Sequence, residues 1–284
     1  MVMKELFLFY QTYIDPVFEM ENFAFLPYLL TFLLLLRVRS LKFSKSWFIP
    51  LFAMYFGFSF GTLFALFLNG ADSRFLPSDT FFSVISNVFN PIKANNKGKV
   101  MYGGYLGSIF GIWFANFIFR RKSLSEYLDI TAIASSLFFA IWRIGCFFSG
   151  CCFGFPSKTF GVSFLMGSKA FNLLQGTDLI VGNETVPLLP TQLMSSAYGF
   201  AIFLFLLILF CKNKTRYPYF YFFAQAFFYG IGRFTVEFLR IDPREFWGPL
   251  SMSQWISLGL VAASLVFFIK NRKEIVQSFR RDVS

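Results

Sequence analysis

Seven apolar stretches recur along this 284-residue chain, separated by more polar segments. An α-helix needs about 20 apolar residues to cross the ~30 Å hydrocarbon core of a membrane, and most of the stretches have about this length. The chain is 56% hydrophobic and only 14% charged, which is more apolar surface than a soluble domain can bury. We therefore predict an all-α polytopic membrane protein with about seven transmembrane helices. The stretches are Asn22–Leu36, Trp47–Leu68, Val100–Phe119, Leu128–Phe148, Leu193–Cys211, Tyr217–Leu239 and Leu250–Ile269.

The distribution of basic residues predicts how these helices are oriented. Most of the 26 lysines and arginines lie in four short segments, which alternate with longer segments of mixed charge. Short loops rich in Lys and Arg stay in the cytoplasm, so we expect the N-terminus outside and the C-terminus in the cytoplasm. The basic segments are Arg37–Lys45, Arg120–Lys122, Lys212–Arg216 and Lys270–Arg281.

Two long loops, residues 69–99 and 149–190, lie outside in this arrangement. Loops of this length are more often functional than simple connections, and we expect them to form a head region. Neither an internal repeat nor a boundary divides the sequence, so residues 1–284 are predicted to be a single integral membrane domain. Acidic rather than basic residues precede the first apolar stretch, and a cleaved signal peptide is therefore not expected.

Glycines spaced by four residues predict where two helices pack closely. Gly57 and Gly61 have this spacing in the second stretch, and Gly103, Gly107 and Gly111 have it in the third. Small residues at this spacing let helix backbones approach each other in lipid.

Composition argues against several classes of function. The chain has no histidine, which removes the usual general base and the commonest neutral metal ligand. The four cysteines form no CxxC pair, so no metal site is expected. The net charge of +11 is divided among short clusters between apolar stretches, and we therefore expect no nucleic-acid binding. Nothing in the sequence implies a cofactor.

Three polar side chains are predicted to lie at one depth in the membrane. Arg143 lies 15 residues after the start of the fourth stretch, and Arg233 lies 16 residues after the start of the sixth. Both helices start in the cytoplasm, so at about 1.5 Å per residue both arginines reach the outer part of the membrane. Tyr102 begins the third stretch from the outside and lies in the same zone. Because a cation there costs roughly 2.5–3.5 kcal/mol, we expect these residues to have a function.

Two arginines at one depth would make a good receptor for a phosphate, since guanidinium groups match its geometry. Simpler interpretations stand beside this hypothesis. Glu237 follows Arg233 by four residues, so the two can form a structural ion pair on one helix face. Arg143 has no acidic residue three or four positions away. The alternative to phosphate binding is that its side chain extends to the outer membrane interface, where the charge is hydrated.

The segment Trp142–Gly154 carries glycines, a serine and three of the four cysteines, which suit a tightly packed turn. A thiol or hydroxyl there can be a nucleophile only beside a base, and none is visible in the sequence. Filling the turn is therefore the favoured role for Cys146, Ser149 and Cys151. A disulfide is a further alternative, with Cys146 as the better partner for Cys151 or Cys152.

Six blocks of sequence, taken in order across most of the chain, resemble the prolipoprotein diacylglyceryl transferase family. Each block alone is a weak signal, but the ordered set on a frame of seven apolar stretches is fairly specific. The blocks are Lys99–Gly107 (KVMYGGYLG), Arg143–Gly154 (RIGCFFSGCCFG), Phe160–Phe164 (FGVSF), Pro190–Leu193 (PTQL), Tyr229–Arg240 (YGIGRFTVEFLR) and Leu250–Gln254 (LSMSQ).

The resemblance implies an enzyme of the bacterial cytoplasmic (inner) membrane. It would transfer a diacylglyceryl group from phosphatidylglycerol to the lipobox cysteine thiol of a prolipoprotein, forming a thioether as glycerol phosphate leaves. Arg143 and Arg233 would bind the phosphate and stabilise charge on the leaving group, and the other catalytic candidates are Tyr102 and Glu237. The expected substrate-binding residues are Tyr28, Gly103, Gly104, Gly145, Cys146, Ser149, Gly150, Cys151, Gly154, Gln192 and Tyr229.

This chain departs from the family's pattern at several positions. The family's histidine is Tyr102 here. Its two signature asparagines are Cys146 and Ser149, and its signature glutamate is Cys151. Tyrosine has a reference pKa of about 10 and is a poor base at neutral pH. Either Tyr102 only forms a hydrogen bond while Glu237 or water takes the proton of the acceptor thiol, or the chemistry has changed.

Two other functions are compatible with the same residues. A diverged relative would act on another phospholipid or another acceptor. A non-enzymatic membrane protein would use the cationic outer region only to bind or transport lipid.

Overall fold

The computed structural model describes residues 24–39, 46, 48–69, 101–119, 123–212, 217–244 and 246–281. These residues are mostly helical and fall into two compact units. The first unit contains the described residues of Met1–Thr31 and Ala132–Ser284, and the second contains those of Phe32–Thr131. The expectation of a single integral membrane domain stays a prediction. The loop expected at residues 69–99 lies outside the described residues, except for Asn69 at the end of a helix.

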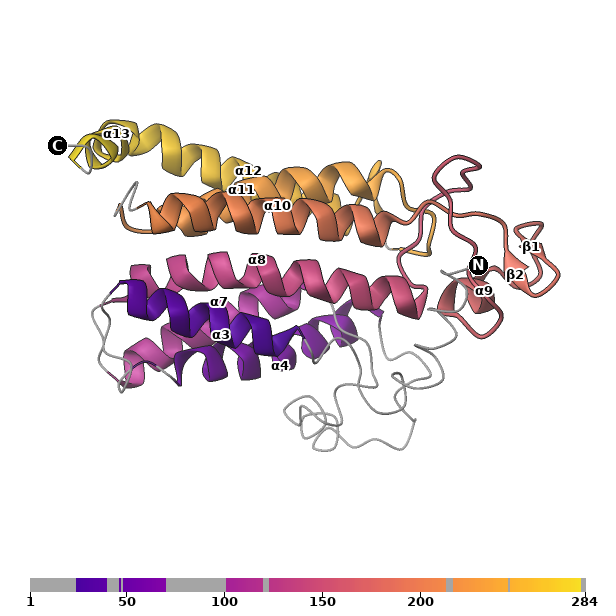
Figure 1. Cartoon of the computed structure of the whole chain (residues 1–284), viewed down its shortest axis with the longest axis horizontal. Helices are drawn as coiled ribbons and strands as arrows, with labels where there is room; N and C mark the ends of the chain where they lie inside the picture. The colour runs from indigo at the N-terminus through magenta and orange to yellow at the C-terminus, as the bar shows by residue number, and fades with distance from the viewer. Residues whose placement is uncertain are drawn as a thin grey trace. The chain divides into compact units, whose positions relative to one another are not determined.

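A helix is present in each predicted apolar stretch, with its ends shifted by a few residues (Figure 1). By length and composition, α8, α10 and α12 are apolar enough to cross a membrane, so the prediction of a mostly helical membrane protein is confirmed. The helices are α3 (Phe25–Val38), α4 (Ile49–Asn69), α7 (Met101–Ile118), α8 (Leu124–Ser149), α10 (Thr191–Cys211), α11 (Phe220–Glu237) and α12 (Met252–Lys270).

The second unit is built on the contact between α4 and α7, where the predicted close approach is confirmed. A Cβ atom added at Gly107 or at Gly111 would collide with the backbone carbonyl of Phe56 or Phe52. A Cβ added at Gly57 would lie 2.6 Å from the hydroxyl of Ser108 on α7. The two backbones can approach this closely only because these positions carry no side chain.

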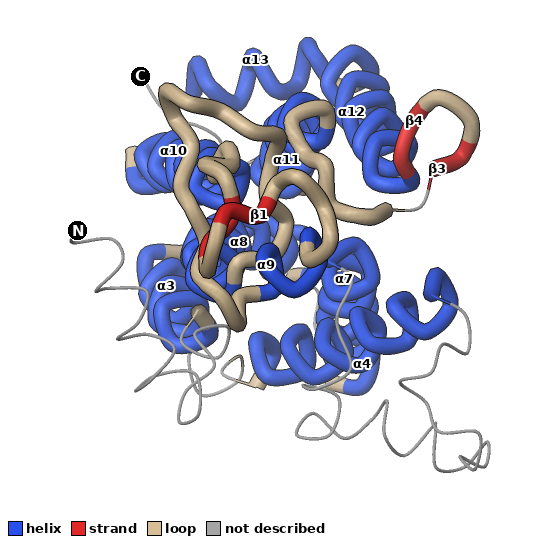
Figure 2. The backbone as a smooth tube through the Cα atoms, turned by 90° about the vertical axis from the view of Figure 1, so that its right-hand side faces the viewer, coloured by secondary structure: helices blue, strands red, loops and turns tan. Residues whose placement is uncertain are grey.

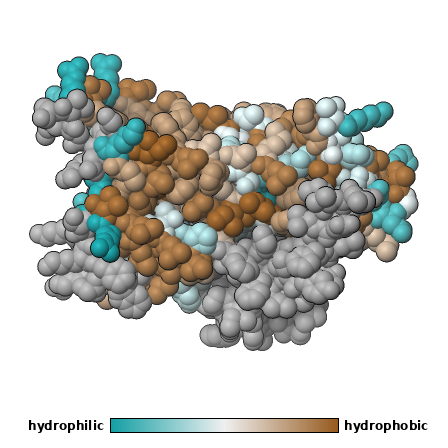
Figure 3. All heavy atoms as spheres, viewed as in Figure 1, coloured by the Kyte–Doolittle hydropathy of each residue, from teal (hydrophilic) through white to brown (hydrophobic). Residues whose placement is uncertain are grey.

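In the first unit, α10, α11 and α12 run side by side (Figure 1). The rings of Phe223 and Phe267 stack at 4.1 Å between α11 and α12. Tyr221, which is fully buried, packs edge-on against Phe210 of α10 at 5.3 Å. Figure 3 shows apolar side chains along these helices and hydrophilic ones near the C-terminal helix.

That last helix, α13 (Arg272–Arg281), was not predicted from the sequence, where its residues count only as a basic tail. It turns away from the direction of α12 (Figures 1 and 2). Its buried Ile275 and its Phe279, whose ring lies 5.5 Å from that of Phe220, attach it to the start of α11. Tyr217 also donates a hydrogen bond of 2.8 Å to the carboxylate of Glu274.

Between α8 and α10 the chain forms a small folded region in front of the ends of α8, α10 and α11 (Figure 2). It contains a short helix, α9 (Lys169–Leu174), and a hairpin of β1 (Ile180–Val181) with β2 (Glu184–Thr185). A second hairpin, β3 (Phe246–Trp247) with β4 (Leu250–Ser251), leads into α12. The small region between α8 and α10 has an apolar core, which consists of Phe147, Phe153, Phe164, Ala170 and Leu188.

Candidate active site

The site begins where α8 ends in a left-handed glycine turn. Gly150 has φ +70, a backbone conformation that side chains other than that of glycine rarely permit. Its N–H donates to the carbonyl of Phe147 at 3.0 Å, and the N–H of Cys151 donates to the carbonyl of Cys146 at 3.1 Å. These two bonds form a Schellman motif, which satisfies carbonyl groups at the end of the helix.

The first residues of α10 hold the next part of the turn through its carbonyl oxygens. The amide nitrogen of Gln192 donates to the carbonyl of Cys151, and the hydroxyl of Thr191 donates to the carbonyl of Cys152. Cys152 has φ +58, which is uncommon for a residue with a side chain and needs such support.

Gly154 and Phe155, which follow the turn, connect it to the start of α10 and to the chain beyond α11. The N–H of Gly154 donates to the carbonyl of Leu189 at 2.9 Å, and the N–H of Phe155 donates to that of Leu239 at 3.1 Å. Gly154 and Arg240 form an antiparallel bridge. The ends of α8, α10 and α11 are therefore fixed to one another by hydrogen bonds.

Arg143 lies inside this arrangement with unused hydrogen-bond donors. Its side chain points toward the turn, since Nη1 donates to the sulfur of Cys146 at 3.8 Å, and the residue is only 8% exposed. Its Nε and Nη2 are buried and have no hydrogen-bond partner among the described residues; the same holds for Oε1 of Gln192 and the hydroxyl of Ser149. Buried polar groups rarely stay unsatisfied, so this set of atoms is suited to binding a polar ligand.

Arg233, by contrast, is already paired. Its Nη1 lies 2.7 Å from the carboxylate of Glu237, one turn further along α11, and its Nη2 donates to the hydroxyl of Ser253 at 3.1 Å. The ion pair considered from the sequence is therefore present.

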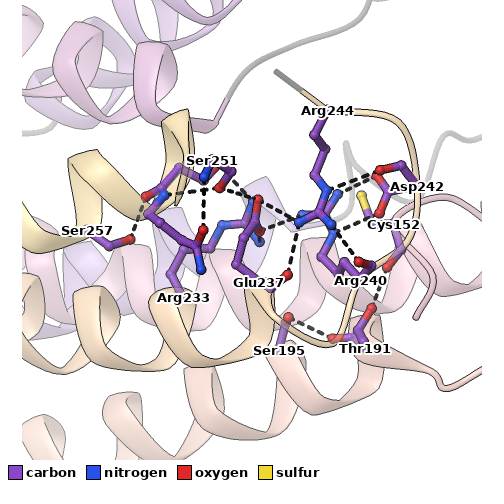
Figure 4. Close-up of polar contacts among 12 residues, drawn as sticks. Cys152, Thr191, Ser195, Arg233, Glu237, Arg240, Asp242, Arg244, Ser251 and Ser257 are labelled. Atoms are coloured by element: carbon purple, nitrogen blue, oxygen red, sulfur yellow. Dashed lines mark hydrogen bonds and ion pairs between the residues drawn. The ribbon is translucent and has the colours of Figure 1, made fainter. Parts of the chain in front are cut away.

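The carboxylate of Glu237 is 3% exposed and has further partners (Figure 4). Arg240 and Arg244 lie 3.3 Å and 2.9 Å from it, and the hydroxyl of Ser251 donates to it at 2.9 Å. Arg240 also pairs with Asp242 at 2.6 Å. Three arginines thus face two carboxylates, so the cluster keeps an excess of positive charge.

All four cysteines lie among the described residues, and each is free, so no disulfide is formed. Three of them, Cys146, Cys151 and Cys152, lie at the turn, where the thiol of Cys151 donates to the carbonyl of Cys146 at 3.6 Å. The hydrogen bonds from Cys146 and Cys151, together with the charges of Arg240 and Arg143, hold the pKa of Cys152 well below its ordinary value despite its burial. The same hydrogen bonds raise the pKa of Cys151.

The structure brings only some of the predicted site residues together. One group of predicted residues lies around the turn after α8. Arg233 and Glu237 lie in the ion-pair cluster with Arg240 and Arg244. The first group is Arg143, Gly145, Cys146, Ser149, Gly150, Cys151, Gly154 and Gln192.

The remaining predicted residues lie elsewhere. The ring of Tyr28 is edge-on to Phe138 at 6.2 Å, and that of Tyr229 is edge-on to Phe139 at 5.1 Å. Both tyrosines thus pack against α8. Tyr102, Gly103 and Gly104 belong to the second unit, and their part in the site stays a prediction.

Sequence reasoning missed several residues that shape the site, namely Cys152, Thr191, Arg240, Arg244 and Ser251. Two signals were available. The alternating charges after α11 place Arg240 three residues beyond Glu237, within reach on the same face. Ser251 and Gln254 have the Ser-x-x-Gln spacing of a capping box, which the structure forms at the start of α12.

Comparisons with a family model and with individual proteins point to the same family. Residues 49–270 match the family described as prolipoprotein diacylglyceryl transferase. A protein named phosphatidylglycerol–prolipoprotein diacylglyceryl transferase 2, from Clostridium perfringens, is 35% identical over 62% of this chain and 65% of its own length. Proteins named phosphatidylglycerol–prolipoprotein diacylglyceryl transferase from Clostridium tetani and Bacillus cytotoxicus are 32% and 34% identical, each over 65% of this chain and over 70% and 66% of their own lengths. The chain thus spans about two thirds of the length of these relatives.

Proposed function

This chain belongs to the prolipoprotein diacylglyceryl transferase family, and we propose that it transfers a diacylglyceryl group from phosphatidylglycerol to the lipobox cysteine thiol of a prolipoprotein. The observation that carries the proposal is Arg143, a buried arginine with two nitrogen atoms that have no hydrogen-bond partner among the described residues. An anionic phosphate is the ligand that such a guanidinium binds best.

The two arginines have different roles in this proposal. Arg143 contacts the lipid phosphate directly and stabilises the charge that develops as the carbon–oxygen bond breaks. Arg233 acts from within its ion pair with Glu237, as part of the excess positive charge beside the turn. A carboxylate surrounded by three guanidinium groups is a weak base, so we assign Glu237 to orienting Arg233.

The other polar contacts to the headgroup come from the turn itself. The amide oxygen of Gln192 and the hydroxyl of Ser149 are buried without partners among the described residues, so both can bind the glycerol hydroxyls of the headgroup. Tyr102, Gly103, Gly104, Tyr28 and Tyr229 remain predicted members of the site.

We also infer that all seven long helices cross the bacterial cytoplasmic membrane, with the N-terminus outside and the C-terminus in the cytoplasm. The basic residues at Arg37–Lys45 and on α13 support this orientation. A reporter fused after residue 281 should be active only if it is one that folds in the cytoplasm. Activity of a reporter that works only outside would reverse the orientation.

The experiment that tests the function is a transfer assay with the purified protein, phosphatidylglycerol and a lipobox peptide. We expect a thioether on the peptide and release of glycerol phosphate, and neither with a peptide whose cysteine is changed to serine. Phosphatidylethanolamine serves as the control lipid, because its headgroup is zwitterionic. Product from phosphatidylethanolamine alone would indicate a diverged donor, and lipid binding without any product would indicate a lipid-binding protein.

A further inference from the structure

The last helix, α13, is strongly basic and follows α12 after a single residue. Its sequence contains four basic residues and one acidic residue. The side chains of Arg272, Lys273 and Arg280 are all exposed. Lys270, which closes α12 beside them, is exposed as well. The end of the molecule at which α12 finishes therefore presents a cluster of positive charge.

The joint between the two helices sets the direction of α13. Asn271 donates to the carbonyl of Phe267 through its backbone N–H at 3.1 Å and through its side-chain amide at 2.8 Å. The next helix begins as the N–H of Ile275 donates to the carbonyl of Asn271 at 3.0 Å. Figures 1 and 2 show that α13 then turns away from α12. Because α12 is long and apolar enough to cross a membrane, α13 starts at the level of the lipid headgroups.

One side of α13 is attached to the other helices of the same unit. Ile275 is 7% exposed, and the ring of Phe279, one turn later, lies 5.5 Å from that of Phe220 at the start of α11. Glu274 accepts a hydrogen bond of 2.8 Å from the hydroxyl of Tyr217, just before α11. The protein thus engages two apolar residues of α13 and its one carboxylate.

A different side of α13 is open and combines positive charge with an apolar side chain. Val276 is 51% exposed. Arg272 and Arg280 lie four residues before and after it, and Lys273 lies three residues before it. Residues three and four apart are neighbours on a helix, so these three cations flank the valine. Lys and Arg beside an exposed apolar residue are typical of helices that lie in a membrane interface.

The chemistry of this open side indicates its partner. Long basic side chains can reach lipid phosphate groups while their carbon chains and Val276 contact the acyl chains. Each Lys or Arg close to an anionic membrane surface strengthens binding about fivefold, whereas a neutral surface gives no such attraction. A soluble polyanion would match the cations but not the valine between them.

We propose that the open side of α13, formed by Arg272, Lys273, Val276 and Arg280, binds anionic phospholipids of the cytoplasmic leaflet. The contact would hold the start of α11 and the end of α12 at the membrane surface. The choice of leaflet rests on the proposed orientation, whereas the binding itself requires no transfer activity.

This surface is separate from the candidate active site. α13 contacts Phe220, the first residue of α11, whereas the turn after α8 is bound to the chain beyond the last residue of that helix. The 18 residues of α11 span about 27 Å between these two places. A lipid bound at α13 is therefore distinct from a lipid whose phosphate is bound by Arg143.

Hydrogen exchange of the full chain in lipid nanodiscs, measured by mass spectrometry, tests the proposal. Discs of phosphatidylcholine alone are compared with discs of phosphatidylcholine and phosphatidylglycerol in equal amounts. We expect the backbone amides of α13 to exchange at least about fivefold more slowly in the anionic discs, because opening the helix must then break its lipid contacts. Raising NaCl to about 1 M, where the screening length is about 3 Å, should remove most of this difference.

Two triple variants test the charge directly. Arg272→Gln with Lys273→Gln and Arg280→Gln should make the exchange of α13 the same in both kinds of disc. Arg272→Lys with Lys273→Arg and Arg280→Lys is the matched control, which keeps every charge and should behave like the unaltered protein. Because the three side chains are exposed, both variants should unfold at close to the normal temperature in detergent.

Several results would overturn the proposal. Equal exchange of α13 in both kinds of disc would show that this helix does not bind anionic lipid. A difference that persists in the glutamine variant would assign the effect to other residues. Equal protection by inositol hexakisphosphate, a soluble polyanion, in discs of phosphatidylcholine alone would show that the surface does not select a membrane.

Arg143→Ala separates this proposal from the proposed function. The exchange of α13 in this variant should depend on lipid as it does in the unaltered protein, and loss of that dependence would assign the effect to the headgroup site instead. The two failures are distinguishable, because absence of thioether in the transfer assay refutes the proposed function, whereas the exchange of α13 is measured without turnover.

Discussion

Arg233 and Glu237 form an ion pair of 2.7 Å across one turn of α11, and the Glu237 side chain that closes it is almost fully buried. Arg143, in contrast, leaves two of its nitrogen atoms without a partner among the described residues. Two arginines that look equivalent in the sequence therefore differ in the structure. Arg233 is paired with a carboxylate, whereas Arg143 has buried donors that are not paired among the described residues.

Arg143→Ala should lower kcat/KM for diacylglyceryl transfer about 100-fold or more, the loss expected when a charge-stabilising donor is removed. Arg143→Lys should recover little activity, because an ammonium group cannot bind a phosphate in the bidentate way. Arg272→Ala, on the exposed surface of α13, is the control and should be unaffected.

Thermal unfolding of the same variants separates a binding role from a structural one. Arg143→Ala should be as stable as the unaltered protein or more so, because the unsatisfied buried donors are gone. A large loss of stability would show that Arg143 holds the fold rather than the lipid.

Glu237→Gln should destabilise the protein by about 3–5 kcal/mol, because three arginines then lose their shared buried carboxylate. Glu274→Gln on α13 is the comparison, since its exposed carboxylate accepts one hydrogen bond and should matter by less than about 1 kcal/mol. Denaturant unfolding in detergent measures the free energy of unfolding of both variants. An equal loss of stability in the two would contradict a stabilising role for the ion pairs of Glu237.

Gly154→Ala should cost about 1–3 kcal/mol of stability through overpacking. A Cβ there would lie 2.6 Å from the carbonyl of Leu239 and 2.8 Å from a methyl group of Thr191. Gly259→Ala provides the contrast, because a Cβ at this position of α12 meets nothing within 4 Å. That variant should be neutral or slightly stabilised, as helix propensity predicts. Unchanged stability in Gly154→Ala would mean that the turn yields more easily than the structure indicates.

The lowered pKa of Cys152 predicts how stability depends on pH. Its pKa in the folded protein lies below its ordinary value, so the stabilisation is complete above about pH 9 and is lost as pH falls through the folded pKa. The stability deficit of Cys152→Ser relative to the unaltered protein should therefore grow as the pH rises toward about 9, the ordinary range of a thiol pKa. A deficit that does not change with pH would indicate that the pKa of Cys152 is not lowered.

The helices were predictable because apolar length is a local property of the sequence. Even the close contact of α4 with α7 could be predicted, since the spacing of Gly107 and Gly111 records it directly. The pairing of Arg233 with Glu237 follows in the same way from residues four positions apart on one helix.

The rest of the site depends on contacts between segments far apart in the chain. Gln192 binds the carbonyl of Cys151, and Arg240 bridges to Gly154, and neither spacing carries a local signal. Cys152 was not singled out because its carbonyl is held by Thr191, which lies 39 residues further along the chain. Sequence reasoning names the residue types at the site, whereas their pairing comes from tertiary structure.

The turn that follows α8 owes its form to main-chain atoms. Its carbonyl groups are held by Thr191 and Gln192, and its amide groups by Phe147, Cys146 and Leu189. The side chains that it displays contribute little to that form. Substitutions of the non-glycine side chains in this turn, natural or engineered, can therefore change its chemistry while the backbone conformation is kept.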